Sequence, residues 1–246
     1  MSADGLADNR AARDRTLARV RSALGKKLPD AQAKANAEAN VTIHRHGPRP
    51  RMPANLRERF IERARDMSST VESIAAISDV PRAIAHYLDT LAPEIGGQPR
   101  AGVCWPEFAT LDWSAAGLSI VSRPTLGNDR LGITGCFCAI AETGTIVITS
   151  GAATPTATAI LPDTHVAIVR AERIVYGMEE AFALIRAEQG ATPRALNLIS
   201  GPSRTGDIEQ TIVLGAHGPF RVHLLVVGYI ANSATSANSG TSRTAE

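Results

Sequence analysis

The chain has 246 residues, of which 44% are hydrophobic, and a formal net charge of +2. This length and apolar content are enough to bury a full core, so we expect one large α/β domain, or one domain with an arm. No run of about 18 uncharged apolar residues occurs, which argues against a transmembrane helix. The N-terminus lacks the basic start and apolar centre of a signal peptide, so we expect a cytoplasmic protein.

The charge is unevenly distributed along the chain. Residues 1–66 hold 15 Lys and Arg against 8 Asp and Glu, whereas residues 67–246 hold 11 against 16. A basic arm can bind nucleic acid, but no aromatic side chains are interleaved here for base stacking. We therefore expect a solvated helix surface, or an arm that docks on an acidic partner, and no nucleic-acid binding.

Residues 1–53 are predicted to form a helical arm and a linker. Leu17, Val20 and Leu24 share one face of an amphipathic helix over residues 9–24. Residues 26–51 are polar and interrupted by prolines, which predicts a linker with at most one weak helix at residues 30–39. His44 and His46 have no carboxylate or cysteine close by in sequence, so they are a weak metal signal.

Residues 54–230 alternate between strand and helix patterns. Helices are predicted over 54–67, from Ser78 or Asp79 to Leu91, and over 172–188. Strands are predicted over 70–75, 102–105, 118–121, 131–134, 145–149, 165–169, 195–199 and 221–227. This order predicts a mostly parallel sheet flanked by helices. Residues 231–246 are small, polar and almost uncharged, which predicts a disordered tail.

The most distinctive stretch is the loop that follows the apolar run at 195–199, which we interpret as a buried strand. The loop holds three hydroxyls, one guanidinium and two carboxylates: Ser200, Ser203, Thr205, Arg204, Asp207 and Glu209. Loops at the carboxyl ends of strands face the ligand crevice in open α/β sheets. Hydroxyls and Arg donate hydrogen bonds to anionic oxygens, so the loop could bind an anionic substrate. The alternative is a turn whose side chains cap a following helix.

Three residues are candidates for proton transfer. Glu142, followed by Thr143 and Gly144, stands between apolar runs, where a partly buried carboxylate suits a general acid or base. The alternative is that Glu142 only ties down loop N–H groups. His217 precedes Gly218 and Pro219 in a loop, where an imidazole could carry protons near neutral pH. Asp207 is the third candidate, with capping of backbone amides as its alternative. His223, inside the last strand, is expected to pack in the core.

The three cysteines, Cys104, Cys136 and Cys138, are too few for a disulfide framework and fit a reducing compartment. Cys136 and Cys138 form a C-x-C pair, but an iron–sulphur cluster needs about four ligands. Neither a G-x-G-x-x-G nor a G-x-x-x-x-G-K-[ST] motif is present. We therefore expect no metal and no cofactor in this chain, and any redox centre in its partners.

Two separated segments resemble the LutC/YkgG family, whose members carry the lactate-utilisation (LUD) domain. One is Ser200-Gly-Pro-Ser-Arg-Thr-Gly-Asp-Ile-Glu209 with Gly215-Ala-His-Gly-Pro219, and the other is Gly132-Ile-Thr-Gly135 with Ala139-Ile-Ala-Glu-Thr-Gly-Thr145. The resemblance implies a fold like the NagB/RpiA/CoA-transferase group. It also implies a part in the oxidation of L-lactate to pyruvate, alongside two iron–sulphur lactate-utilisation proteins. The alternatives are an independent small-molecule enzyme of that fold group (an isomerase, acyl-CoA transferase or cyclo-ligase), or a non-catalytic structural subunit.

Overall fold

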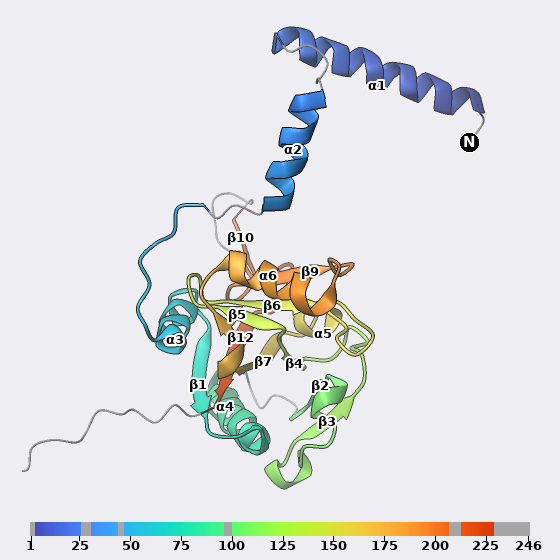
Figure 1. The fold of residues 1–246 in the computed structure, drawn as a ribbon. Helices are drawn as coiled ribbons and strands as arrows, with labels where there is room; N and C mark the ends of the chain where they lie inside the picture. The colour runs from blue at the N-terminus through green and yellow to red at the C-terminus, as the bar shows by residue number, and fades with distance from the viewer. Residues whose placement is uncertain (1–2, 26–30, 44–46, 96–99, 207–212, 229–246) are drawn as a thin grey trace, which may run out of the picture. The chain divides into compact units, whose positions relative to one another are not determined.

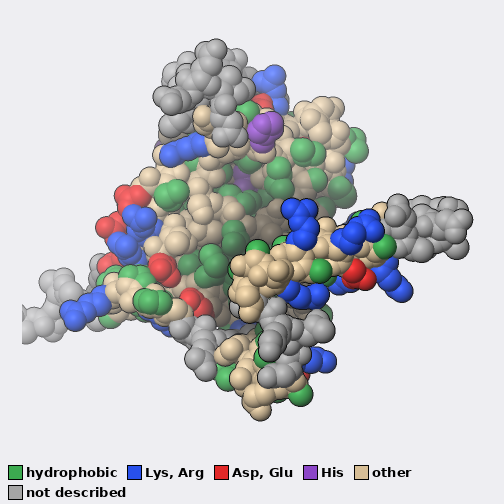
Figure 2. Space-filling model, turned by 90° about the horizontal axis from the view of Figure 1, so that it is seen from above, with side chains coloured by type: hydrophobic (Ala, Val, Ile, Leu, Met, Phe, Trp, Pro, Cys, Tyr) green, Lys and Arg blue, Asp and Glu red, His purple; other side chains and the backbone are tan. Residues whose placement is uncertain are grey.

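A computed structural model describes residues 3–25, 31–43, 47–95, 100–206 and 213–228. The chain divides into two units, Met1–Pro50 and Arg51–Glu246. The first unit contains α1 (Ala3–Ala23) and α2 (Ala31–Ile43). The helix predicted from Asn9 therefore begins earlier, and the weak helix predicted at 30–39 is a full helix of 13 residues. Arg side chains stand along α1, the rod whose far end is grey in Figure 2.

The second unit is built on a six-stranded sheet in which every neighbouring pair of strands is parallel. The order is β1–β12–β7–β4–β2–β3, so β1 and β3 lie at the two edges (Figure 1). The strands are β1 (Thr70–Ile74), β2 (Ala101–Cys104), β3 (Ser119–Ser122), β4 (Leu131–Gly135), β7 (Thr164–Arg170) and β12 (Arg221–Val227). This sheet confirms the predicted α/β class.

The central strands of this sheet form the core. Every residue of β4 and the first six residues of β7 are buried. Strands that are buried on both faces need continuous apolar runs, which is why the sequence pattern identified them. His223 lies in the core as predicted and is 3% exposed.

Helices and short 3-10 turns cover this core. α3 (Leu56–Asp66) begins at Asn55, whose side chain accepts from the N–H of Glu58, and it buries Phe60 and Ala64. The other helices are α4 (Val80–Ile95), α5 (Ala157–Ile160) and α6 (Met178–Gln189). The 3-10 turns are η1 (Ile77–Asp79), η2 (Pro106–Phe108), η3 (Ser114–Ala116) and η4 (Ala171–Arg173).

A second, four-stranded sheet has the order β8–β5–β6–β9. Its strands are β5 (Cys138–Ile140), β6 (Thr145–Thr149), β8 (Ile174–Val175) and β9 (Leu196–Ile199), and a hairpin of β10 (Arg204–Thr205) and β11 (Val213–Leu214) follows. The chain passes from β4 into β5 and from β7 through η4 into β8, and β5 then pairs with β8. This sheet therefore extends from the carboxyl ends of β4 and β7. It lies beside α6 above β7 and β12 in Figure 1.

Two predictions for this region are wrong. The helix predicted over 172–188 begins only at Met178, because Ile174 and Val175 pair with β5. The Glu180 carboxylate accepts from the N–H of Gly177 and so starts the helix there. The strand predicted at 195–199 is not buried in the main sheet. It is β9, which pairs antiparallel with β6 and leaves Leu198 41% exposed.

Candidate functional site

The structure brings together the two sequence segments that carried the functional prediction. Antiparallel pairing of β6 with β9 places the start of β6 beside the end of β9. The hydroxyls of Thr143, Thr145 and Ser200 form a chain there, with both oxygen–oxygen distances equal to 2.6 Å. Thr145 is 4% exposed, whereas Thr143 and Ser200 are half-buried. The predicted substrate-binding residues Thr143 and Ser200 therefore lie in one hydrogen-bonded cluster.

The glycines of these segments are packed against α3 and the residues that follow it. Gly144 has a φ of +67°, and a Cβ on it would lie 2.3 Å from the backbone nitrogen of Ala64. Gly201 has a φ of +83°, and a Cβ on it would lie 1.9 Å from the carbonyl oxygen of Met67. Only glycine fits both the positive φ and these close approaches. Both glycines therefore have a structural role.

Arg204, the arginine predicted to bind an anionic substrate, already has a hydrogen-bond partner within the protein. Arg204 is exposed, begins β10 and donates a hydrogen bond to the hydroxyl of Ser68. Thr205 follows it in the same strand, and Ser203 exchanges backbone hydrogen bonds with the segment that follows β11, through Gly215 and Pro219. An anion at Arg204 would therefore have to compete with the Ser68 hydroxyl.

Of the three candidates for proton transfer, the structure describes Glu142 and His217, which lie in different loops. Glu142 is half-buried in the turn between β5 and β6, and its backbone N–H donates to the carbonyl of Tyr176. His217 is exposed in the loop after β11. Asp207, like Glu209, lies outside the described residues, as do His44, His46 and the predicted tail.

A pocket of about 340 Å³ lies at the carboxyl edge of the main sheet, away from this cluster. Its walls come from the segments after β2, β4 and β6 and from the end of α6. The lining residues are Trp105, Glu107, Cys136, Phe137, Thr149, Ser150, Gly151, Thr154 and Gln189. A concave site at this edge is where ligands bind in open parallel sheets.

Glu107 is the charged residue that lines this pocket, and Arg170 lies beside Glu107 without lining the pocket itself. Glu107 Oε2 lies 3.8 Å from Arg170 Nη2, and both side chains are about half exposed. Burial raises the pKa of Glu107, and the positive charge of Arg170 opposes that shift. A Cβ on Gly135, the last residue of β4, would lie 2.3 Å from Glu107 Oε1, so the carboxylate lies against the strand end.

The thiols near this edge are protonated at neutral pH. Burial is the main cause that raises the pKa of Cys136, and it raises the pKa of Cys104 and of Cys138 to about 11. A protonated thiol is a poor nucleophile and a poor metal ligand. Among the residues that the structure describes, no three His, Cys, Asp or Glu side chains are grouped to hold a metal ion.

Sequence reasoning missed Glu107 and Arg170. Each follows or ends a strand that was correctly predicted: Glu107 comes three residues after β2, and Arg170 is the last residue of β7. Charged residues at the carboxyl ends of predicted parallel strands are the signal that could have identified them. The order of the strands was also needed, because only neighbouring strand ends form one site.

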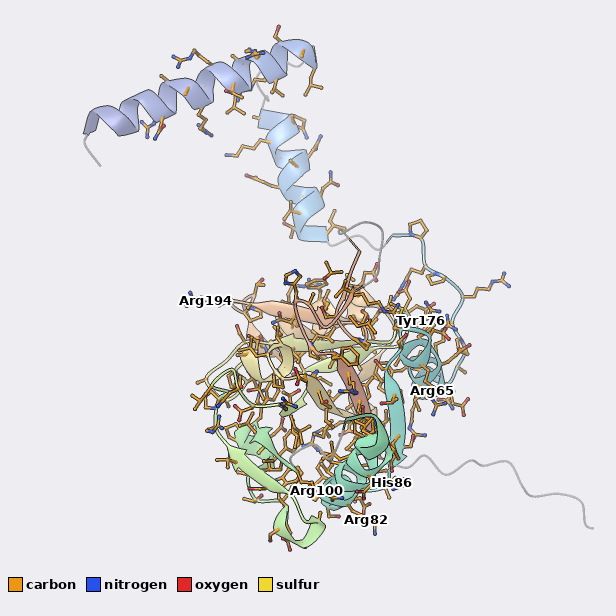
Figure 3. All side chains as sticks on the ribbon, turned by 180° about the vertical axis from the view of Figure 1, so that it is seen from behind. Arg65, Arg82, His86, Arg100, Tyr176 and Arg194 are labelled. Atoms are coloured by element: carbon orange, nitrogen blue, oxygen red, sulfur yellow. The ribbon has the colours of Figure 1, made fainter. Side chains whose placement is uncertain are left out.

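A larger pocket, of about 460 Å³, lies between the end of β1 and the first turns of α4. Its polar lining includes Glu72, Asp79, Arg82 and His86, and Figure 3 shows Arg82 and His86 near each other on α4. Arg82 pairs with Asp79 at 3.1 Å. We place the candidate site at the carboxyl-edge pocket instead, because burial raises the pKa of Glu107 there and ligands bind at this edge of open parallel sheets.

No described helix combines the length and the apolar character needed to span a membrane. The fold and this pocket define an α/β protein with a candidate small-molecule site at the carboxyl ends of parallel strands.

Comparisons with known proteins identify the family. The profile described as LUD domain matches residues 107–227. Lactate utilization protein C of Deinococcus radiodurans is 32% identical over 188 residues, which cover 74% of this chain and 84% of that protein. The Bacillus licheniformis protein of the same name is 35% identical over 129 residues, so the chain spans only about half (53%) of its length. The chain belongs to the LUD domain family, that of lactate utilization protein C.

A solved structure agrees with this assignment. The crystal structure of a DUF162 family protein from Deinococcus radiodurans has a TM-score of 0.53 and 26% identity with this chain. The match covers 73% of this chain and all of that protein. The likeness therefore extends to the fold as well as to the sequence.

Proposed function

We propose that this chain is a component of an L-lactate oxidation system that yields pyruvate and includes two iron–sulphur partner proteins in the cytoplasm. The observation that carries the proposal is the 32% identity with a protein named Lactate utilization protein C over 84% of that protein's length. The iron–sulphur partners would supply the electron carriers, and this chain would contribute a substrate site. Its pocket at the carboxyl edge supports that division, because Arg170, which lies 3.8 Å from the lining residue Glu107, can attract an anionic substrate to the border of the pocket.

The test is lactate-dependent reduction of a dye by the two iron–sulphur partners, measured with and without this chain. We expect activity to require the chain, and we expect D-lactate to replace L-lactate poorly. Equal activity without the chain would contradict the proposal. Adding the chain after denaturation is the matched control, because it separates folded function from nonspecific protection of the partners.

The second candidate is an independent small-molecule enzyme. It is favoured by one observation: Glu107 has a raised pKa and lines a pocket beside two aromatic side chains, Trp105 and Phe137. Turnover by the isolated chain, lost in Glu107→Gln and kept in Asp163→Asn, would support this candidate. Asp163 is a suitable control because its exposed carboxylate also pairs loosely with an arginine, Arg130, at 3.9 Å.

A further inference from the structure

Three neighbouring strands deliver groups to the carboxyl-edge pocket or its border: Glu107 and Cys136 line the pocket, and Arg170 lies 3.8 Å from Glu107. β4 lies between β2 and β7, and the chain places Glu107 after β2, Cys136 after β4 and Arg170 at the end of β7. At 3.8 Å, Glu107 and Arg170 are near each other but are not within hydrogen-bond distance. The guanidinium can therefore exchange one carboxylate for another without breaking a bidentate pair.

Two hydroxyls in the pocket lining, those of Thr149 and Ser150, supply hydrogen-bond donors. The Thr149 hydroxyl oxygen accepts from Gln189 Nε2 at 3.0 Å, and the Ser150 hydroxyl oxygen accepts from the N–H of Ala195 at 2.9 Å. Within the described part of the chain neither hydroxyl donates, so both hydrogens can point to a ligand. Trp105 and Phe137 complete the pocket with aromatic surface. Donors beside aromatic walls favour a small organic anion over inorganic phosphate.

We propose that this pocket binds a small organic carboxylate, which takes Arg170 in place of Glu107, and that Glu107 takes up one proton as the ligand binds. The inference rests on the proposed function and deepens it, because it names the substrate class, the residues and the coupled proton. Two carboxylates that face one guanidinium repel each other, and one proton on Glu107 removes that repulsion. The protonated carboxyl can then donate to the ligand.

The groups that face Glu107 are consistent with this coupling. Arg170 approaches from β7, and the Cys136 thiol approaches from the segment after β4. The thiol is neutral because burial raises its pKa. Burial also raises the pKa of Glu107 itself, so the proton that it takes up costs less than it would on an exposed glutamate.

The test is calorimetric titration of the isolated full chain with sodium L-lactate and with sodium pyruvate. Each titration is run in two buffers of different ionisation enthalpy, which reports the number of protons taken up. We expect uptake approaching one proton, and affinity that falls by up to about tenfold per pH unit as the pH rises. Lactamide, the neutral amide of lactate, should not bind. Binding without proton uptake, equal binding of lactamide, or no binding of either carboxylate would overturn the proposal.

Variants separate the two charged groups. Glu107→Gln should bind the carboxylate at least as tightly as the wild type and should lose both proton uptake and pH dependence. Arg170→Gln should weaken binding by about tenfold or more, as expected for the loss of a charge-assisted contact. Weaker binding by Glu107→Gln, or unchanged binding by Arg170→Gln, would overturn the proposal.

Arg130→Gln is the matched control for Arg170→Gln. Arg130 is about as exposed, makes a similarly loose ion pair at 3.9 Å with Asp163, and directly precedes β4, so it lies at the opposite end of the sheet. The Arg130→Gln variant should leave ligand affinity unchanged.

The two experiments distinguish failure of this inference from failure of the proposed lactate role. If dye reduction by the partners requires this chain but the chain binds no carboxylate, only the pocket proposal is refuted. If the chain binds a carboxylate with proton uptake but dye reduction does not require the chain, only the lactate role is refuted.

Discussion

Replacing Gly144 by alanine should destabilise the protein far more than its small size change indicates. Gly144 closes the turn between β5 and β6, and its N–H donates to the carbonyl of Ile140 at 3.0 Å. A Cβ on it would meet three backbone atoms of α3, at 2.3, 2.5 and 2.8 Å. Because backbone atoms of a helix cannot rotate away, α3 must move as a whole.

The loss of stability expected for Gly144→Ala has two contributions. A left-handed φ costs an alanine about 1 kcal/mol or more. Moving α3 so that its nearest atom retreats from 2.3 Å to at least 3.0 Å disturbs the packing of Phe60 and Ala64, both 0% exposed. Overpacking of this kind costs about 1–3 kcal/mol. The total of about 2–4 kcal/mol is a large share of the ~5–15 kcal/mol by which a domain is stable.

Gly117→Ala is the matched control. Gly117 has a φ of +69°, against +67° at Gly144, but no heavy atom lies within 4 Å of a Cβ placed on it. Equilibrium unfolding in urea, followed by the fluorescence of the buried Trp105 and Trp113, gives the free energy of each variant. We expect Gly117→Ala to lose about 1 kcal/mol and Gly144→Ala clearly more. Equal losses would show that α3 does not constrain this turn.

Three further predictions concern buried groups. Burial lowers the pKa of His165 to about 3 and of His223 to about 4, below the ordinary 6.5, so both are neutral when folded. The unfolded chain therefore binds more protons than the folded protein below pH 6.5. As the pH falls from 7 to 5, the free energy of unfolding measured in urea should decrease by about 2 kcal/mol per histidine. A free energy of unfolding that does not change over this range would contradict this. The thiols of Cys104 and Cys138, with pKa values raised to about 11, should react with Ellman's reagent at pH 8 only after unfolding. Because Cys136 is only partly buried, the result that would contradict their burial is fast reaction of more than one thiol in the native protein. Thr145→Val removes the middle hydroxyl of the chain formed with Thr143 and Ser200, and it should lower the free energy of unfolding by about 1–3 kcal/mol in the same urea assay. An unchanged free energy of unfolding would mean that the neighbouring hydroxyls find other partners.

Much of the main sheet could be predicted from the sequence because burial on both faces requires continuous apolar runs. The predicted runs 131–134, 165–169 and 221–227 correspond to β4, β7 and β12, with ends that differ by two residues or fewer. Two further predicted strands, 102–105 and 118–121, correspond to β2 and β3 and begin within one residue of them. Local pattern alone was enough for these elements.

The second sheet could not be predicted in the same way. β5 follows β4 after only Cys136 and Phe137, and a single glycine, Gly135, is too weak a turn signal to divide the run into two strands. β8 has two residues, too few for a periodic pattern. The partner of β9 is β6, which lies about 50 residues earlier, and no local signal specifies that pairing.

The candidate site could not be predicted either, because it depends on which strands are neighbours and no local sequence signal specifies that. The loop at 200–209 is rich in hydroxyls and drew attention, yet Thr143, Thr145 and Ser200 bond to one another and Arg204 bonds to Ser68. Glu107 is a single carboxylate in a Pro-Glu-Phe segment, with no motif around it. Its position matters only because β2, β4 and β7 are neighbours, which is a property of the fold.

β6 connects the distinctive sequence motif to the pocket. Thr145, at one end of this strand, belongs to the hydroxyl chain, and Thr149, at the other end, lines the pocket. Between them, the carbonyl of Val147 accepts from the N–H of Phe137 at 2.8 Å, which holds Phe137 in the pocket wall. The motif residues are therefore joined to the pocket by this strand without contributing to its lining. Thr145→Val should accordingly weaken carboxylate binding less than Arg170→Gln does in the calorimetric titration, although it destabilises the fold more.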